Sequence, residues 1–299
     1  HVYSNLNTPY VTTLCDNSGK RLETLITNET LVKRLEAENL GTREFFTFTT
    51  ADNVLLYGIM VKPRNFDPSK RYPVVMTQYS GPGSQRVLDK WAGAELGEGT
   101  MFEHFLCQQG FICVIVDGRG TGGRGAAFER CTYMNIGKFE ARDQAETAAY
   151  LGSLPYVDKS RIGIWGWSFG GFCTLLAMSE GRGLFASGVA IAAPTDWRYY
   201  DTVYTERFMR TPKENSLGYD YSPMTRAPFL QGDLLLIHGL ADDNVHFRNM
   251  AEYTEALVQA DKDFRELTYT NRNHSIYGGN TRRHLRRQVA QHFLTMRDR

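Results

Sequence analysis

The stretch Gly166-Trp167-Ser168-Phe169-Gly170 decides the fold of this chain. It follows the apolar run 162–165 and precedes the apolar stretch 172–178, so we expect a strand, a sharp turn and a helix in that order. Glycine two positions before and two positions after a serine leaves room for a strained turn, which lifts the serine hydroxyl clear of the sheet. A serine on such a turn forms a nucleophile elbow. Ser168 is therefore the candidate nucleophile.

Apolar strand patterns alternate with helical patterns along most of the chain. Strands are predicted at 45–50, 54–62, 74–78, 111–117, 162–165, 188–192, 234–238 and 266–269. Helices are predicted at 101–109, 139–151, 170–180, 247–260 and 282–297. The short turn 51–53 makes the first two strands antiparallel, and apolar strands separated by helices indicate a mostly parallel sheet covered on both faces. The predicted fold class is therefore α/β, namely an α/β-hydrolase fold with an eight-stranded sheet and the elbow after the fifth strand.

Residues 9–27 stand apart from this alternation. Two segments of alternating character, 11–14 and 21–26, flank the turn cluster Asp16-Asn17-Ser18-Gly19, which is typical of a β-hairpin. A short helix is expected from Leu31 to Asn39. The sequence therefore predicts two parts, a small one at residues 1–40 and a large α/β domain at residues 41–299.

Composition and charge exclude several classes of function. The chain has 34 basic and 33 acidic residues, so its net charge of +1 gives no reason to expect a nucleic acid or a membrane surface as a partner. The longest strongly apolar run, 111–116, is too short to span a bilayer. The five cysteines form no CxxC or metal-ligand spacing, so we expect neither a metal nor another cofactor.

A serine nucleophile needs a base to take its proton and an acid to orient that base. In this fold the acid and then the histidine follow the serine, in loops after later strands. Of the seven histidines, only His274 lies in a loop after the last predicted strand. The loop after strand 234–238 offers Asp242 and Asp243, and either could also serve as a turn or helix-cap aspartate. The local pattern His-Gly-x-x-Asp-x-x-Val places the acid three residues before Val245, which selects Asp242.

Several motifs in this order resemble the prolyl oligopeptidase family of serine peptidases, and within it the dipeptidyl peptidase IV branch. They are Tyr79-Ser80-Gly81-Pro82-Gly83-Ser84-Gln85, Asp117-Gly118-Arg119-Gly120, Gly166-Trp167-Ser168-Phe169-Gly170-Gly171, residues 197–207 and residues 238–247. The resemblance extends from about residue 45 to the C-terminus. It implies a catalytic triad of Ser168, Asp242 and His274, with the Tyr79 phenol and the backbone N–H of Phe169 binding the oxyanion. The residues implied in substrate binding are Asn244 and Arg207 at a backbone carbonyl, and Trp197, Tyr200, Tyr204, Val245 and Phe169 around a proline ring.

The activity that the resemblance implies is cleavage after proline or alanine near the N-terminus of peptides, through an acyl-enzyme and without a cofactor. The expected substrates are peptides with proline at the second position, as for dipeptidyl peptidase IV. A prolyl tripeptidyl or acylaminoacyl peptidase of the same family is an alternative. An esterase on the same fold is a further alternative, which the Tyr79 loop disfavours because it replaces the HGGG motif of lipases.

The family also has an N-terminal β-propeller, which in this branch supplies the glutamates that bind the amine of the substrate. We expect that this chain lacks the propeller, and that residues 1–40 are the remnant of its last blade and a linker. The missing propeller is thus an expected partner, and the resemblance also allows a homodimer. It further implies a periplasmic, cell-surface or secreted location.

Two other functional classes, a dinucleotide-binding protein and a non-catalytic binding domain, are alternatives to a hydrolase. The run Gly118-Arg119-Gly120-Thr121-Gly122-Gly123 satisfies the GxGxxG pattern of dinucleotide-binding proteins. That fingerprint belongs on the first strand–helix turn, whereas here it follows the fourth predicted strand, so a loop near the active site is the better interpretation. A non-catalytic binding domain of the same fold is disfavoured because all three triad residues are present.

Overall fold

The computed structural model describes residues 1–38, 40–91 and 99–299. Eight strands form its main sheet, in the order β11-β10-β9-β8-β6-β7-β5-β4. They are β4 (Thr42–Thr49), β5 (Leu55–Lys62), β6 (Tyr72–Thr77), β7 (Ile112–Asp117), β8 (Val157–Trp167), β9 (Ser187–Ile191), β10 (Asp233–Gly239) and β11 (Arg265–Tyr269). The β4–β5 and β5–β7 pairs are antiparallel, and β6 to β11 are joined by parallel pairs. The predicted α/β-hydrolase sheet is confirmed, with the elbow after the fifth strand.

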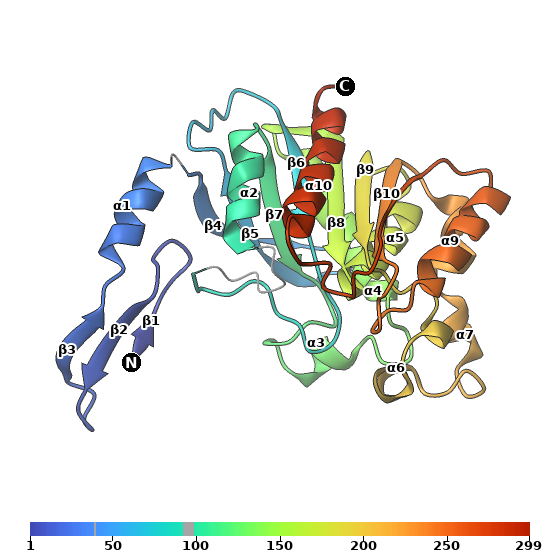
Figure 1. The fold of residues 1–299 in the computed structure, drawn as a ribbon, viewed down its shortest axis with the longest axis horizontal. Helices are drawn as coiled ribbons and strands as arrows, with labels where there is room; N and C mark the ends of the chain where they lie inside the picture. The colour runs from blue at the N-terminus through green and yellow to red at the C-terminus, as the bar shows by residue number, and fades with distance from the viewer. Residues whose placement is uncertain (39, 92–98) are drawn as a thin grey trace.

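Helices cover both faces of this sheet (Figure 1). On one face lie α2 (Gly99–Gln108) and α10 (Thr281–Arg297), and on the other α4 (Lys138–Ser153), α5 (Phe169–Glu180) and α9 (Arg248–Gln259). Side chains alternate across the sheet: in β6, Val74 packs in the layer of α5 and Val75 in the layer of α10. Every residue of β7 is buried, as expected of a strand covered on both sides.

Short helices that the sequence pattern did not predict occupy two long connections. The connection from β7 to α4 contains α3 (Ala126–Arg130). The connection from β9 to β10 contains α6 (Thr202–Met209), α7 (Ser216–Asp220), α8 (Pro223–Arg226) and two single 3₁₀ turns. Of these helices, α3, α7 and α8 have five residues or fewer, which is too short to show a helical repeat of apolar residues. No helix in the described ranges is long and apolar enough to cross a membrane.

The N-terminal part forms a second, three-stranded antiparallel sheet of β1 (Val2–Tyr3), β2 (Val11–Cys15) and β3 (Arg21–Ile26), followed by α1 (Glu29–Ala37). The hairpin predicted at 9–27 is confirmed. The predicted helix end at Asn39 lies outside the described residues. Figure 1 shows this part beside the β4 edge of the main sheet. The backbone N–H of Leu6 donates to Asp89 at 2.8 Å and connects the two parts.

Candidate active site

Ser168 lies on the turn between β8 and α5, with backbone angles φ 58° and ψ −120°. This φ is unfavourable for a residue that carries a side chain, and strain of this kind is typical of active sites. A Cβ atom at Gly166 would lie 2.4 Å from the backbone of Gly170, and one at Gly170 would lie 2.4 Å from the carbonyl oxygen of Gln78. Both flanking glycines are therefore required by close backbone packing, as predicted from the sequence.

The carboxylate of Asp242 lies in the loop after β10 and is fully enclosed. Its Oδ1 accepts hydrogen bonds from the backbone N–H groups of Asn244 at 3.0 Å and Val245 at 2.9 Å. Its Oδ2 lies 2.8 Å from Nδ1 of His274 and 3.2 Å from Nε2 of His238. The structure therefore pairs His274 with Asp242 and leaves Asp243 exposed.

Opposing influences act on the ionisation of Asp242. Burial alone would raise its pKa, but the hydrogen bonds from His238 and His274 outweigh burial and hold the pKa well below its usual range. The carboxylate is therefore ionised throughout the neutral range. An ionised acid can accept the Nδ1–H of an imidazole and leave Nε2 free to take a proton.

His274 is held from both sides of its loop after β11. Its Nδ1 contacts Asp242, and its backbone carbonyl accepts a 3.0 Å hydrogen bond from the indole N–H of Trp167. Trp167 precedes Ser168, so the histidine loop is tied directly to the elbow. No hydrogen bond joins the Ser168 hydroxyl to the His274 ring within the described part of the chain. Such bonds are often long in the absence of substrate and shorten when it binds.

The two predicted oxyanion donors come from adjacent segments. Tyr79 follows β6, and Phe169 is the first residue of α5, where a backbone N–H has no partner within the helix. Their rings lie 6.0 Å apart between centroids. A Cβ atom at Gly81 would lie 2.4 Å from the Phe169 ring, so the Tyr79 loop packs closely against the elbow. The structure thus places the Tyr79 ring against the first residue of the helix that follows Ser168.

The predicted proline pocket forms a connected aromatic cluster beside the elbow. The Trp197 ring lies 5.7 Å from that of Phe169 and 5.8 Å from those of Tyr200 and Tyr204. The hydroxyl of Tyr200 donates to Oδ1 of Asn244 at 2.9 Å, which connects the cluster to the loop of Asp242. Burial raises the pKa of Tyr200 to about 12, so this phenol keeps its proton at neutral pH.

Two further residues predicted to bind substrate have other neighbours, namely Arg207, predicted at a backbone carbonyl, and Val245, predicted in the proline pocket. Arg207 lines a cavity of about 550 Å³ together with Arg130, Phe208 and Pro82. The side chain of Val245 is fully buried. Its backbone stabilises the loop that carries Asp242, because the N–H donates to Asp242 and the carbonyl oxygen lies 2.8 Å from Nε2 of His238.

Sequence reasoning missed two supporting residues, His238 and Trp167. In the sequence, His238 served only as the first residue of the pattern that located the acid, yet in the structure it is buried against Asp242. Its place four residues before the acid was a usable signal, because the residue at the end of a parallel strand points at the edge where the site forms. Trp167 gave no such signal, because its partner is a backbone carbonyl that is 107 residues away in sequence.

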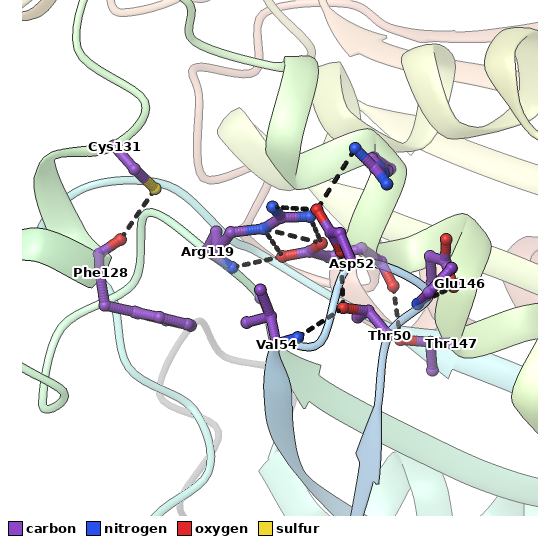
Figure 2. Close-up of polar contacts among 12 residues, drawn as sticks. Thr50, Asp52, Val54, Arg119, Phe128, Cys131, Glu146 and Thr147 are labelled. Atoms are coloured by element: carbon purple, nitrogen blue, oxygen red, sulfur yellow. Dashed lines mark hydrogen bonds and ion pairs between the residues drawn. The ribbon is translucent and has the colours of Figure 1, made fainter.

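The glycine-rich loop after β7 holds a polar cluster of its own (Figure 2). The Arg119 guanidinium lies 2.6 Å from Asp143 and 2.8 Å from Asp52. A Cβ atom at Gly118 would lie 2.9 Å from Asp143, so the glycine makes room for this ion pair rather than for a phosphate. In the described ranges, no group of three or more His, Cys, Asp or Glu side chains is placed to hold a metal ion.

This chain is similar to known proteins both in sequence and in structure. A family model described as the prolyl oligopeptidase family matches residues 101–297. The crystal structure of Porphyromonas gingivalis dipeptidyl peptidase 4 is similar with a TM-score of 0.94 and 49% identity, and the match covers 98% of this chain and 41% of that one. "Probable dipeptidyl-aminopeptidase B" of Talaromyces marneffei is 38% identical over 295 residues, which cover 97% of this chain and 31% of the relative. "Prolyl endopeptidase FAP" of Mus musculus is 39% identical over 239 residues, which cover 79% of this chain and 30% of the relative. The chain therefore spans about a third of the length of these curated relatives.

Proposed function

The chain belongs to the prolyl oligopeptidase family, and on that premise we propose that it carries the catalytic centre of a serine peptidase that cleaves peptides after proline or alanine near their N-terminus. The observation that carries the proposal is the hydrogen bond between His274 and the buried Asp242, next to a serine on a strained elbow. The names of the relatives, which include dipeptidyl peptidase 4, support the same substrate class.

In the first half of the proposed reaction, Nε2 of His274 takes the proton of the Ser168 hydroxyl while the serine oxygen attacks the scissile carbonyl carbon. The electron pair of the carbonyl moves to its oxygen, which the Tyr79 hydroxyl and the Phe169 N–H stabilise. The imidazolium then gives its proton to the leaving amine, and the C–N bond breaks. Asp242 remains ionised throughout and stabilises the imidazolium.

In the second half, water replaces the leaving amine. His274 takes a proton from the water as its oxygen attacks the ester carbonyl of the acyl-enzyme. The proton returns to the Ser168 oxygen as the ester bond breaks, which restores the free enzyme. One amide bond and one water molecule are consumed, and no cofactor takes part.

The aromatic cluster supports specificity for proline. Proline is small, rigid and apolar, so rings such as Trp197 and Tyr204 can bury it while leaving little space for a longer side chain. Replacing Tyr204 by Ala is expected to reduce the ratio of kcat/KM for proline over leucine substrates by roughly tenfold, because a hydrophobic contact contributes about 1–3 kcal/mol of discrimination. Val203→Ala is the matched control, because Val203 lies on the same helix with 78% of its surface exposed. An equal loss of the ratio in both variants would refute the assignment of the pocket.

Two observations support a further domain beyond this chain. The chain begins with a small separate sheet, and it spans only about a third of the length of its curated relatives. We propose that residues 1–40 are the end of a β-propeller blade and a linker, and that the rest of the propeller binds the amine of the substrate. Release of dipeptides, rather than tripeptides or acylated residues, would then depend on that domain.

The experiment measures kcat/KM for a free-amine proline nitroanilide, its N-blocked analogue and a p-nitrophenyl ester. Each substrate is tested on this chain and on a longer chain that includes the preceding residues. The longer chain should prefer the free amine by about a hundredfold, since loss of one partner of a buried ion pair costs a few kcal/mol. An equal preference in the shorter chain would place the amine anchor within these residues. Hydrolysis of the ester alone by both chains would instead favour an esterase.

A further inference from the structure

The end of the Tyr79 loop is held by a buried carboxylate that the proposed reaction does not use. Asp117 is the last residue of β7 and is only 5% exposed. Its Oδ2 accepts hydrogen bonds from the backbone N–H groups of Arg86 at 2.8 Å and Val87 at 2.7 Å, and its Oδ1 accepts from Arg86 at 3.0 Å. Two consecutive amides therefore point at one buried anion.

The start of the same loop is held by side chains from the elbow side of the sheet. The amide of Gln78 donates to the carbonyl oxygen of Gly170 and, at 3.1 Å, to the hydroxyl of Thr174, both in α5. The hydroxyl of Ser80 donates to Oε1 of Gln78 at 3.0 Å. The loop from residue 78 to residue 87 is thus fixed at its start to the nucleophile helix and at its end to Asp117.

Arg86 connects the anchored end of the loop to the oxyanion donor. Its backbone N–H is bound by Asp117, and its guanidinium lies over the ring of Tyr79, 5.2 Å from the ring centroid. A cation over an aromatic face is attracted by the ring quadrupole, so it restricts where the ring can lie. A shift of Arg86 would therefore release Tyr79 from one side.

Burial raises the pKa of Asp117, while the hydrogen bonds from Val87 and Arg86 favour its ionised form. A buried carboxylate is costly unless it is satisfied by hydrogen bonds. The two amides of the loop therefore offset part of the cost of burying this carboxylate.

We propose that Asp117 is a positioning residue for the oxyanion donor, and that it acts through Arg86 to hold the Tyr79 phenol where negative charge develops on the substrate. This inference rests on the proposed function, because it assumes that Tyr79 stabilises an oxyanion formed at Ser168. Misplacement of a catalytic group by about 1 Å can reduce the rate by 10²-fold. Loss of the hydrogen bonds by which Asp117 holds this loop should therefore have a measurable effect on the rate.

The neighbouring buried carboxylate Asp143 provides a matched control. Its side chain accepts hydrogen bonds from the backbone N–H of Arg119 at 2.7 Å and from the Arg119 guanidinium at 2.6 Å. Both aspartates hold a segment adjoining β7 in place, but only Asp117 binds the Tyr79 loop.

The test is a double-mutant cycle on the rate at which a fluorophosphonate probe modifies Ser168 in the intact chain. The phosphonyl oxygen of the probe occupies the oxyanion position, so this rate reports on Tyr79 without any contribution from a peptide-binding domain. Tyr79→Phe should slow labelling about 10²-fold. Asp117→Asn should slow it about tenfold in the wild-type background and less than about twofold in the Tyr79→Phe background, because groups that act as a unit are not additive. Asp143→Asn should change the rate by the same factor in both backgrounds.

An equal factor for Asp117→Asn in both backgrounds would overturn the proposal, because the residue would then act on the site independently of Tyr79. If Asp117→Asn does not fold, Arg86→Met tests the same connection while keeping the backbone amide that Asp117 binds. It should slow labelling about threefold, and only when Tyr79 is present; an equal effect in both backgrounds overturns the proposal too. Absence of any labelling of Ser168 in the wild-type chain would instead contradict the proposed function, so the two failures are distinguishable.

Discussion

Replacing Asp242 by Asn tests the proposed role of this carboxylate, which is to orient His274 and stabilise its protonated form. Oδ1 of the carboxylate accepts two backbone hydrogen bonds, and an asparagine oxygen can keep both of them. The new amide N–H₂ then faces Nδ1 of His274, where Oδ2 lies 2.8 Å away in the native chain. Since a donor at that place favours the tautomer whose Nε2 carries the proton, the ring can no longer accept the proton of Ser168. Loss of the correct tautomer costs about 10⁴ in rate, which corresponds to about 5 kcal/mol of transition-state stabilisation.

The assay is hydrolysis of a p-nitrophenyl ester together with the rate of fluorophosphonate labelling. Asp243→Asn is the matched control, because Asp243 is the exposed neighbour in the same loop, and its rates should change less than about twofold. Because the pKa of Asp242 is lowered on folding, its contribution to stability is present at neutral pH and is lost as pH falls through the folded-state pKa. The melting temperature of Asp242→Asn should therefore lie below that of the native chain at pH 7, with a smaller gap in acid. Retention of more than about a tenth of the native rate by Asp242→Asn would refute the reasoning, as would an equal loss in Asp243→Asn.

Two further predictions concern stability. Gly170→Ala should destabilise the chain by about 3 kcal/mol or more in urea unfolding, since its Cβ would lie 2.4 Å from the carbonyl oxygen of Gln78. Gly122→Ala, whose Cβ would lie 3.7 Å from its nearest neighbour, should have almost no effect, and an equal cost at both sites would count against the packing argument. Burial raises the pKa of Glu140 from 4.5 to about 8, so the native chain should lose stability as pH rises from about 5 to 8, because ionisation of this carboxyl is easier in the unfolded state. Glu140→Gln should show a flatter profile of melting temperature over this range, and an unchanged slope would contradict the account.

The sheet could be predicted from the sequence because its signals are local. Runs such as 111–116 are apolar throughout, which is typical of a strand covered on both faces, and the structure has β7 there. The glycines around Ser168 indicated the elbow because only a residue without a side chain fits so close to another backbone, and Gly166 and Gly170 both show this contact.

The supporting contacts of the site could not be predicted in the same way. Asp117 lies in a motif that the sequence singled out, but its partners are backbone amides of Arg86 and Val87, which any residue other than proline can supply. The same holds for Trp167, which donates to the carbonyl of His274. A residue that contributes only its backbone to a hydrogen bond can be of almost any type, so its position in the sequence shows no recognisable pattern. Such contacts become visible only in the folded structure.

The most direct test of a serine nucleophile at the elbow is to locate the fluorophosphonate adduct by mass spectrometry of peptides from the labelled chain. The expected adduct is a single one on the peptide that carries Ser168, absent from Ser168→Ala and formed far more slowly in His274→Ala. Labelling that persists in Ser168→Ala, or that falls on another residue of the native chain, would contradict it.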